Sequence, residues 1–587
     1  MENGISPYMP KRRIKRKMGR KEEKYLAYLV GCNKNKRGQD IDNLIKTISE
    51  LWQSHSVNDW IVSNAKTMLC QIMDLQTFPR TFSVFIEMNY VDKVYRDIYY
   101  HHYASRHFSQ PRNCIRLFFF DLSCSDGISM GLNRQTEEIE LPLLEDGNCS
   151  HFVGVCVLQP NGIIGRSYWN PHYFLTSGNY VRTSRFSGSV LGQRWTIRAF
   201  PYMMQDQEAT TCAEVTVLNL IDYYSNSYTE YPCALLSDIE LVEARHSADR
   251  IFPSRGMSYA DVSRSLAQIG LAPIVYASHS SKLTHLFMRR YLYYYVESGI
   301  PFGIAVESGE RGILHSMICI GHGPMEYNWL EEQTVNYLSK DKYGDDSEEQ
   351  LHQCWIANSA DAYCSFVVMD DNQTPYRTVK LTISSPERWT YPTTYNQITT
   401  YAVDYLCVPL YKRVFLSADG AEELFCSILT SRMGFQAIVC KQNKEGLYHL
   451  IGSNQDDPLI IRIFLASSRT FFAERIAMFQ KISETKMDRH FETVYQNLYC
   501  PRFIWVCELY SKELFHCTNP QAIGEIVVDA TARQTGNTDS FDGVILIHYP
   551  HYITYRDAES NWTALNHNSK QLEKWCPFQQ FHGNLSS

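Results

Sequence analysis

The sequence predicts a multidomain protein of mixed α/β and α+β class, and three observations support this. A length of 587 residues suits about three domains, each large enough to bury its own core. A composition of 44% hydrophobic and 20% charged residues is that of ordinary globular protein, which excludes wholesale disorder, collagen and coiled coil. Along the chain, stretches with helical spacing of apolar residues alternate with short runs rich in β-branched and aromatic residues.

The first segment, residues 1–40, is a basic N-terminal arm. It carries a net charge of +8, which leaves −15 for the rest of the chain. The run Lys11–Lys17 is typical of segments that contact nucleic acid, an acidic membrane or an acidic partner, and equally of a solvated, frayed terminus. The acidic remainder argues against a nucleic-acid-binding body. The basic run is followed by the charged segment Lys21–Lys24 and not by the apolar core of a signal peptide. No run of 18 apolar residues occurs either. We therefore expect a cytoplasmic protein without a membrane span.

An N-terminal α/β domain is expected over residues 41–198. Apolar residues recur at helical spacing within Ile41–Leu75. Three strand-like runs follow, which are Thr81–Met88, Cys114–Phe120 and His151–Gln159. The segment Arg182–Gln193 is rich in Ser, Gly and Arg, and this composition predicts a connection to the next domain.

A C-terminal α+β domain is expected over residues 402–587. Its candidate strands are Asp404–Val414, Gln436–Cys440, Leu459–Leu465, Arg502–Leu509, Gly524–Asp529 and Gly543–His548. Helical spacing occurs in Ala421–Met433 and Phe472–Ile482. The acidic residues on these strands, Glu508, Glu525 and Asp529, are predicted to be solvated or ion-paired structural groups, since no catalytic partner accompanies them.

Cysteine usage narrows the chemistry. The 18 cysteines are about 3% of the chain, far fewer than in a small disulfide scaffold. No Cys-x-x-Cys pair occurs, so zinc-ribbon, iron–sulfur and thioredoxin sites lack their usual pattern, and we expect neither a metal nor a cofactor. The cysteines are predicted to be mostly reduced, buried thiols among which a reactive one is to be sought.

The candidate nucleophile is Cys212, in the central region 199–401. From Ala213 onward, four apolar residues recur at helical spacing, namely Val217, Leu220, Ile221 and Tyr224. Thr210 and Thr211 are suitable N-caps, which places Cys212 in the first helical turn or just before it. The positive end of a helix dipole favours a thiolate, the nucleophilic form of cysteine. Upstream, the amide of Gln205 could donate to an oxyanion together with the Cys212 backbone N–H, and Gln207 remains an alternative.

The candidate base is His315, because a thiolate nucleophile needs a base and a group that orients it. Val296–Val306 has the pattern of a helix end, a Gly-Ile-Pro turn and a buried strand. His315 opens the next apolar strand, where a strand start can aim an imidazole across a cleft. His322 closes the same strand beside glycines and is expected to be only a turn residue.

The candidate orienting acid lies at the end of a further apolar strand, where Asp370, Asp371 and Asn372 follow one another. One carboxylate would accept from the distal ring nitrogen of His315 and stabilise the imidazolium. Because side chains alternate along a strand, we expect only one of the two aspartates to face the ring. Asp370 is favoured because it directly extends the strand, and Asp371 and Asn372 stay open.

This ordered set resembles the papain-like cysteine peptidase superfamily, and is most similar to its bacterial bacteriocin-processing branch. The matching features are a glutamine, a cysteine at a helix start, Gly-x-Pro before a strand, a histidine opening the next strand and an aspartate ending a third. The resemblance covers roughly 200 residues, about one domain. It implies a helix packed on an antiparallel sheet. It also implies an oxyanion residue, a nucleophile, a base and an orienting acid, which map respectively to Gln205, Cys212, His315 and Asp370.

Two local features bear on this resemblance. The family has a small residue after the cysteine, which Ala213 provides, but Glu214 follows, and its carboxylate disfavours a thiolate unless it points to solvent. The pair Asn358-Ser resembles the Asn-Ser pair of papain, although it precedes the strand that ends in Asp370.

The functional hypothesis is a cysteine peptidase, or a related thiol acyl-transfer hydrolase, that acts on peptide or isopeptide bonds of a peptide or protein substrate. The same residues support deamidation, transglutamination or acyl transfer to an amine. The alternative is a catalytically inactive papain-like binding module that holds a protein or peptide partner.

Overall fold

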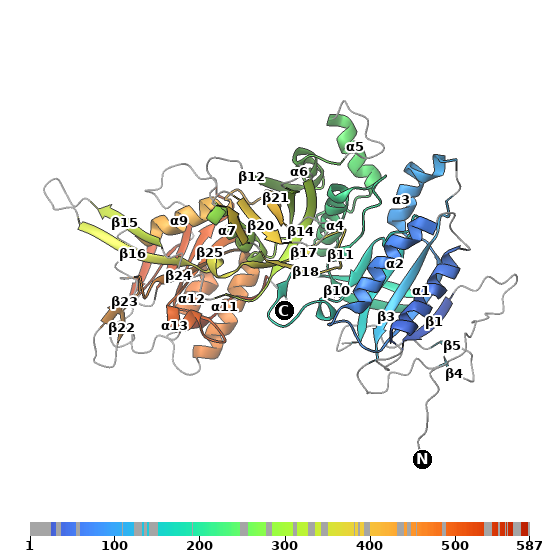
Figure 1. The fold of residues 1–587 in the computed structure, drawn as a ribbon. Coiled ribbons are helices and arrows are strands. Elements are labelled where there is room, and N and C mark those ends of the chain that lie inside the picture. The colour runs from blue at the N-terminus through green and yellow to red at the C-terminus, as the bar shows by residue number, and fades with distance from the viewer. Residues whose placement is uncertain are drawn as a thin grey trace, which may run out of the picture.

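The computed structural model of the chain describes most of the residues between 25 and 584. The described ranges are 25–30, 37–53, 59–107, 110–122, 132–133, 138–139, 151–190, 192–246, 256–277, 285–308, 314–326, 335–341, 350–380, 382–385, 388–392, 400–430, 440–442, 448–452, 455–483, 489–532, 543–549, 552–557, 559, 561–566 and 577–584. The basic run Lys11–Lys17 and most of the expected strand Gln436–Cys440 lie outside them. The protein is a mixed α/β molecule built on three large sheets (Figure 1).

The N-terminal sheet is antiparallel, with strand order β1-β2-β3-β6-β7-β11. Its strands are β1 (Tyr25–Val30), β2 (Phe82–Tyr90), β3 (Cys114–Asp121), β6 (Phe152–Leu158), β7 (Ser167–Trp169) and β11 (Pro201–Tyr202). The accompanying helices are α1 (Arg37–Gln53), α2 (Asp59–Asp74), α3 (Lys93–His101) and the 3-10 turn η1 (Tyr103–Ser105). The helical spacing expected over Ile41–Leu75 thus corresponds to two helices.

Successive side chains of this sheet point to opposite faces, and each face packs into a separate apolar core. Phe119 of β3 packs in the cluster that holds the apolar residues of α1 and α2. Its neighbours Phe118 and Phe120 pack on the other face with Trp195. That face is covered by a hairpin of β9 (Ser184–Val190) and β10 (Gln193–Ala199). The expectation of a connection over Arg182–Gln193 is therefore wrong. The apolar Phe186 and Val190, among Ser, Gly and Arg, are buried while the described residues adjacent to them in sequence are exposed, which is the alternation of a strand.

The central sheet is antiparallel, with strand order β18-β17-β14-β13-β21-β20-β19, and β12 and β8 pair with β21 and β14. Its strands are β8 (Tyr180–Val181), β12 (Leu271–Ala277), β13 (Phe302–Ser308), β14 (Leu314–His322), β17 (Ser365–Met369), β18 (Arg377–Lys380), β19 (Thr382–Ser385), β20 (Arg388–Pro392) and β21 (Thr400–Tyr411). The helices of this region are α4 (Cys212–Ser227), α5 (Leu236–His246), α6 (Tyr259–Gln268) and α7 (His285–Glu297).

The third sheet has strand order β15-β16-β24-β25-β27-β28-β29-β30 and is antiparallel except for β16 beside β24. Its strands are β15 (Val335–Asp341), β16 (Gln350–Asn358), β24 (Leu459–Ser467), β25 (Phe503–Tyr510), β27 (Gly524–Asp529), β28 (Val544–His548), β29 (Tyr552–Arg556) and β30 (Trp562–Asn566). Helices α9 (Ala418–Thr430), α11 (Ser468–Ser483), α12 (Arg489–Asn497) and α13 (Lys512–Phe515) belong to the same part of the chain.

The short elements complete the described structure. They are the strand pairs β4 (Leu132–Asn133) with β5 (Glu138–Ile139), β22 (Cys440–Gln442) with β23 (Tyr448–Leu450), and β26 (Gln521–Ala522) with β31 (Phe578–Gln579), and the 3-10 turns η2 (Pro171–Tyr173) and η3 (Ser359–Ala362).

Several strands join sheets other than those their sequence position suggests. Strand β1 lies in the expected basic arm and β11 in the expected central region, yet both belong to the N-terminal sheet, and β8 of the expected N-terminal domain pairs with β14 of the central sheet. Strand β21 contains most of the strand expected to begin the C-terminal domain, yet it pairs with β12 and β13 of the central sheet. Conversely, β15 and β16 come from the expected central region and extend the third sheet. Sequence patterns show that a strand exists but not which sheet edge accepts it, and this explains these differences.

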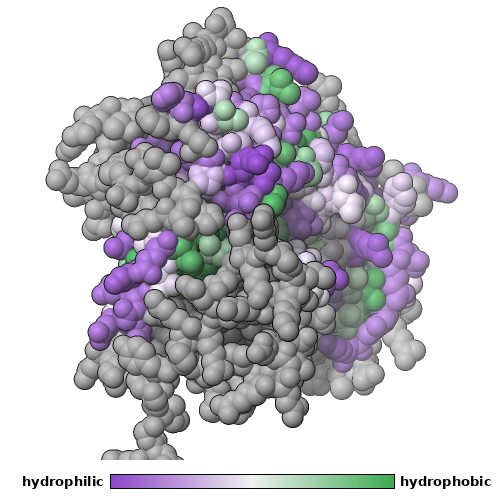
Figure 2. All heavy atoms as spheres, turned by 90° about the vertical axis from the view of Figure 1, so that its right-hand side faces the viewer, coloured by the Kyte–Doolittle hydropathy of each residue, from purple (hydrophilic) through white to green (hydrophobic). Residues whose placement is uncertain are grey.

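One buried apolar core runs through all three parts of the molecule, from Ile41 to Phe581. No helix among the described residues combines the length and apolar character needed to cross a membrane. The face shown in Figure 2 is mainly hydrophilic where it is described, with apolar side chains in small separate areas.

Candidate active site

Cys212 is the first residue of α4, as the helix-start pattern predicts. Thr211 is the N-cap, and its backbone N–H donates to Oε2 of Glu214 at 3.0 Å, while its hydroxyl also donates to that carboxylate. Glu214 is buried, so its side chain does not point to solvent but turns back to cap its own helix. The thiol of Cys212 is partly exposed and lies at the positive end of a 16-residue helix.

His315 lies near the start of β14, as expected, and this strand packs against α4. Next to it, the Ser316 hydroxyl donates to Oγ1 of Thr216 at 3.0 Å and ties the strand to α4 one turn after Cys212. Nε2 of His315 lies 2.9 Å from Oδ1 of Asp370, and the Cys212 side chain acts as a hydrogen-bond partner that raises the pKa of the same ring. The imidazole therefore bridges the thiol and a carboxylate.

His315 and Asp370 each stabilise the charged form of the other. Burial lowers the pKa of His315, but the charge of Asp370 and hydrogen bonds to Asp370 and Cys212 outweigh it, so the pKa lies well above its usual value. Burial raises the pKa of Asp370, yet the His315 imidazolium and a hydrogen bond from the Asn372 backbone bring it below its usual value. At neutral pH the pair is thus an imidazolium beside a carboxylate.

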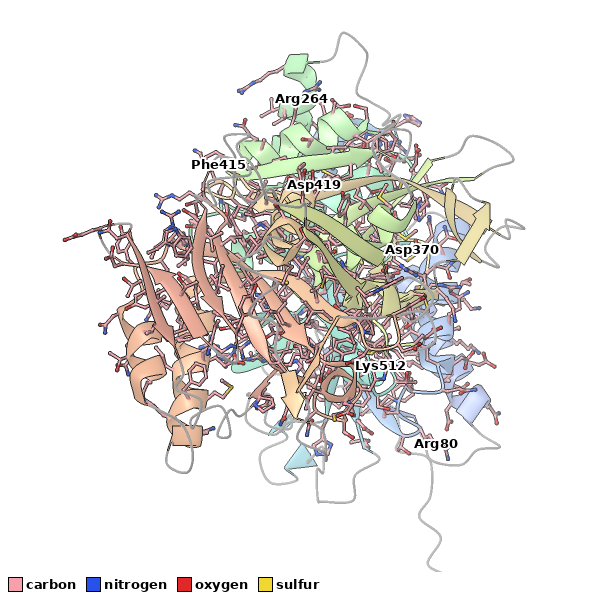
Figure 3. The ribbon with its side chains drawn as sticks, turned by 90° about the vertical axis from the view of Figure 1, so that its left-hand side faces the viewer. Arg80, Arg264, Asp370, Phe415, Asp419 and Lys512 are labelled. Carbon is pink, nitrogen blue, oxygen red and sulfur yellow. The ribbon has the colours of Figure 1, made fainter. Side chains whose placement is uncertain are left out.

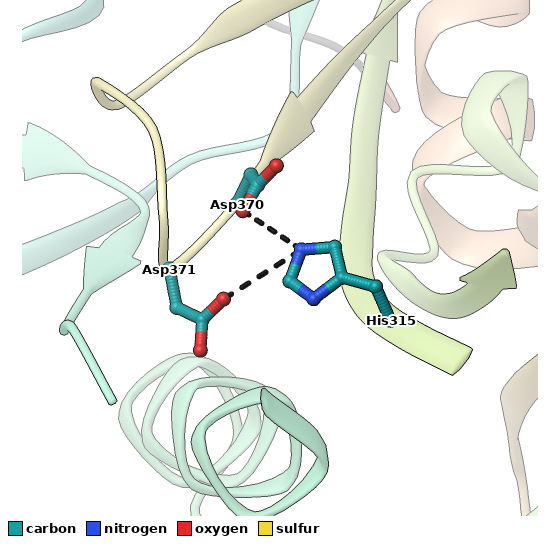
Figure 4. A group of neighbouring side chains, drawn as sticks. All are labelled: His315, Asp370 and Asp371. Atoms are coloured by element: carbon teal, nitrogen blue, oxygen red, sulfur yellow. Dashed lines mark hydrogen bonds and ion pairs between the residues drawn. The ribbon is translucent and has the colours of Figure 1, made fainter. Parts of the chain in front are cut away.

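Both aspartates approach the same ring nitrogen, contrary to the alternation argument. Oδ1 of Asp371 lies 3.7 Å from His315 Nε2, against 2.9 Å for Asp370 (Figure 4). Strand β17 ends at Met369, so Asp370 and Asp371 belong to the following turn and are not held to opposite faces. Only Asp370 is within hydrogen-bond distance of the ring.

Asp371 is a buried carboxyl whose two oxygens have no hydrogen-bond partner among the described residues. Burial raises its pKa to about 7, although His315 opposes the shift, and the charge of Asp370 adds to the increase. Below about pH 7 we therefore expect Asp371 to be a neutral acid beside the ion pair of His315 and Asp370.

Gln205 joins the same network through Asn372. Its Nε2 donates to Oδ1 of Asn372 at 3.0 Å, and the Asn372 N–H donates to Oδ1 of Asp370 at 2.9 Å. The alternative Gln207 is exposed in a turn with φ 61°. Sequence reasoning kept Asn372 only as a substitute for Asp370, whereas its observed contacts link the glutamine to the aspartate.

Two other residues have roles that differ from those expected or considered. Asn358 donates to Oε1 of Glu422 at 3.2 Å and to the Tyr294 hydroxyl, so it binds groups outside the site. His322 is not a simple turn residue, because it is buried with Nε2 2.8 Å from Oε1 of Glu297. Figure 3 shows Asp370 within the body of the molecule, while Arg80 and Arg264 lie at its periphery.

The donor atoms of His315, Asp370 and Asp371 lie within 4.8 Å of one another, a spacing compatible with a small cation. The ring nitrogen already contacts Asp370, and a cation there would have to replace the proton between them. The ion pair accounts for these contacts, and no metal is assigned.

No protein-family model matches this chain, and no curated protein matches it in sequence either. The chemistry and geometry of the site therefore carry the argument for a function. Gln205, Cys212, His315 and Asp370 come from distant parts of the sequence and meet in one network of contacts.

Proposed function

We propose that this chain is a cysteine peptidase, or a related thiol acyl-transfer hydrolase, that cleaves peptide or isopeptide bonds. The observation that carries the proposal is the His315 ring, whose Nε2 lies 2.9 Å from Asp370 and whose strand packs against the helix that begins at Cys212. The Cys212 side chain also raises the pKa of this ring as a hydrogen-bond partner. A nucleophile, a base and an orienting acid connected in this order form the arrangement used in thiol catalysis.

The proposed reaction begins with the Cys212 thiolate beside the His315 imidazolium. The sulfur attacks the carbonyl carbon of the substrate, and the electron pair of the C=O bond moves to oxygen. The backbone N–H of Cys212, which has no acceptor within its own helix, and the amide of Gln205 donate to this oxyanion. His315 gives its proton to the leaving amine as the carbon–nitrogen bond breaks, which leaves a thioester on Cys212.

Deacylation reverses the proton transfers. His315 takes a proton from water, the hydroxide attacks the thioester carbon, and the carbon–sulfur bond breaks to release a carboxylic acid. The thiolate and imidazolium are regenerated. Asp370 contacts Nε2 throughout, orients the ring and stabilises the imidazolium in both half-reactions.

The fold gives general support to a papain-like assignment of the central region. Helix α4 carries the nucleophile at its first residue and packs against β14, which carries the base, within an antiparallel sheet. We propose that the central sheet and its helices form a papain-like domain nearest to the bacteriocin-processing type, with peptide or protein substrates in the cytoplasm. This unit comes mainly from residues 199–401, without β15 and β16 and with β21 reaching Tyr411. We also propose that the basic N-terminal arm attaches the protein to an acidic partner or to nucleic acid.

The test is the acylation of Cys212 by p-nitrophenyl acetate, an activated ester that needs no peptide specificity. The full chain should release a rapid burst of about one nitrophenolate per chain, followed by slower turnover. Cys212→Ala should lose the burst, while Cys233→Ala, which removes an exposed thiol, should retain it. A burst that survives Cys212→Ala would contradict the proposal. The absence of a burst in the intact, folded chain would favour a non-catalytic binding module.

A further inference from the structure

The loop between Gln205 and Cys212 is closed by one carboxylate. Oδ1 of Asp206 accepts hydrogen bonds from three successive backbone N–H groups, at 3.0, 2.9 and 2.8 Å, and from the Thr210 hydroxyl at 3.2 Å. The three N–H groups belong to Glu208, Ala209 and Thr210. The Asp206 N–H donates back to Oγ1 of Thr210 at 3.1 Å. The carboxylate therefore fixes the backbone directly after Gln205.

The other oxygen of Asp206 is held by the N-terminal part of the molecule. Oδ2 accepts from the Tyr103 hydroxyl at 2.7 Å and from Nδ2 of Asn161 at 3.4 Å. Tyr103 lies in η1, Asn161 lies in the turn after β6, and both are buried. Burial and the charge of Asp206 raise the pKa of Tyr103, so its hydroxyl stays protonated and acts as a donor. Asp206 thus links two domains at the loop that carries the oxyanion residue.

Gln205 and Cys212 are anchored by different devices. Cys212 is fixed by the start of α4, where Glu214 caps Thr211. Gln205 contacts Asn372 on one side and is followed by the turn that Asp206 closes. Loss of the Asp206 carboxylate should therefore release the glutamine while the nucleophile keeps its place.

We infer that Asp206 is a positioning residue for the oxyanion-binding amide of Gln205, and that Tyr103 and Asn161 make the N-terminal domain part of the catalytic unit. This inference rests on the proposed function. It assigns a role to a domain in which the sequence shows no catalytic motif. The domain orients the site without itself contacting the reacting atoms.

The test compares two reactions of the same thiol in the full chain. Acylation by p-nitrophenyl acetate passes through an oxyanion, whereas alkylation by iodoacetamide displaces iodide from a CH₂ group and forms none. Asp206→Ala should slow the nitrophenolate burst by about tenfold or more, within the range seen for a lost oxyanion donor. The rate of Cys212 alkylation, followed by mass spectrometry, should stay within about twofold of the unmodified chain, because α4 is intact.

Four further single variants and one double variant define the result. Gln205→Ala should show the same selective loss, and adding Asp206→Ala to it should cost little more, since both act on one donor. Asp206→Asn keeps one acceptor oxygen and should recover part of the acylation rate. Glu208→Ala is the matched control, because among the described residues the carboxylate of this acid pairs with Arg106 and His102 at a more exposed position, and both rates should stay unchanged. Tyr103→Phe should give a smaller selective loss.

The outcomes separate the inference from the proposed function. If Asp206→Ala slows acylation and alkylation equally, or slows neither, Asp206 is not a positioning residue and the inference fails. If Asp206→Ala does not fold, Asp206→Asn and Tyr103→Phe decide between the same outcomes. If the unmodified chain shows neither a burst nor selective alkylation at Cys212, the proposed function itself fails.

Discussion

Strand β14 carries a histidine near each end, and the two have different surroundings. Nε2 of His315 lies 2.9 Å from Asp370 and 3.7 Å from the Asp371 carboxyl, and the Cys212 side chain raises the pKa of the ring as a hydrogen-bond partner. In His322, Nε2 lies 2.8 Å from Glu297 and Nδ1 lies 2.7 Å from the carbonyl oxygen of Gly323. Both nitrogens of His322 are therefore occupied by fixed oxygen atoms, and no position remains for a reacting group.

The surroundings of His322 extend this contrast into the third sheet. Glu297 also binds Arg462, Arg462 binds Glu508, and Glu508 binds Arg475. All of these side chains are buried, and each charge has an opposite charge beside it. The network at His322 is a closed set of paired buried charges, whereas the site at His315 combines an ion pair with a thiol and a second carboxyl. A buried histidine suits catalysis when one nitrogen is left to a reactive group.

The largest effect on this comparison should come from His315→Gln. Loss of the base should reduce the nitrophenolate burst rate by about 10³-fold or more, with a melting temperature close to that of the unmodified chain. Burst kinetics and thermal unfolding measure the two quantities. A large loss of stability with retained activity per folded molecule would reverse the assigned roles of the two histidines.

The converse variant is Arg462→Leu, which leaves Glu297 and Glu508 without this partner in a buried environment. The free energy of unfolding should fall by about 3–5 kcal/mol, as measured by urea titration, with the burst amplitude per folded chain unchanged. Arg502→Leu is the matched control, because this half-exposed arginine pairs with Glu230 at the surface. Arg502→Leu should lower the free energy of unfolding by less than about 1 kcal/mol. Equal costs for both variants would contradict the difference between buried and exposed pairs.

The choice between the two aspartates is tested by Asp370→Ala and Asp371→Ala. Removal of the carboxylate at 2.9 Å from the ring should slow the burst by about 10²-fold. Removal of its neighbour at 3.7 Å should change the rate by only a few-fold. A larger loss for Asp371→Ala would make that residue the orienting acid.

A smaller effect concerns the pH dependence of stability. Asp371 has a pKa of about 7 in the folded chain and about 3.9 when unfolded. Between these two pH values the folded state therefore binds one proton more than the unfolded state. The contribution of Asp371 to the free energy of unfolding falls as the pH rises through that window. Asp371→Asn should remove this slope, and the unmodified chain should lose up to about 1.4 kcal/mol per pH unit relative to it between pH 5 and 7. Chemical unfolding of both chains across pH measures it, and parallel curves would contradict the shift.

The sequence was sufficient for local features of the site. The N-cap threonine places Cys212 at the first residue of α4, and apolar runs place His315 near the start of one strand and Asp370 just after another. These positions depend on neighbours in the sequence, which is why periodicity and capping residues predict them.

Features that depend on distant partners could not be predicted from the sequence. The pairing of β16 with β24 and of β21 with β13 joins residues about 100 positions apart, for which no local pattern exists. Likewise, the role of His322 depends on Glu297 and Arg462, and that of Asp206 depends on Tyr103 and Asn161. The expectation that only one aspartate faces the ring fails because strand alternation ceases at Met369, where the strand ends.

The central claim is that His315 activates Cys212, and it is tested most directly by mapping low-dose iodoacetamide alkylation at neutral pH by mass spectrometry. In the unmodified chain and in folded His322→Gln, Cys212 should be modified at least about tenfold faster than the exposed Cys233 and Cys517, since an imidazolium favours its thiolate. In His315→Gln this preference should disappear. Modification of Cys233 or Cys517 before Cys212 in the unmodified chain, or an unchanged preference in His315→Gln, would contradict the account.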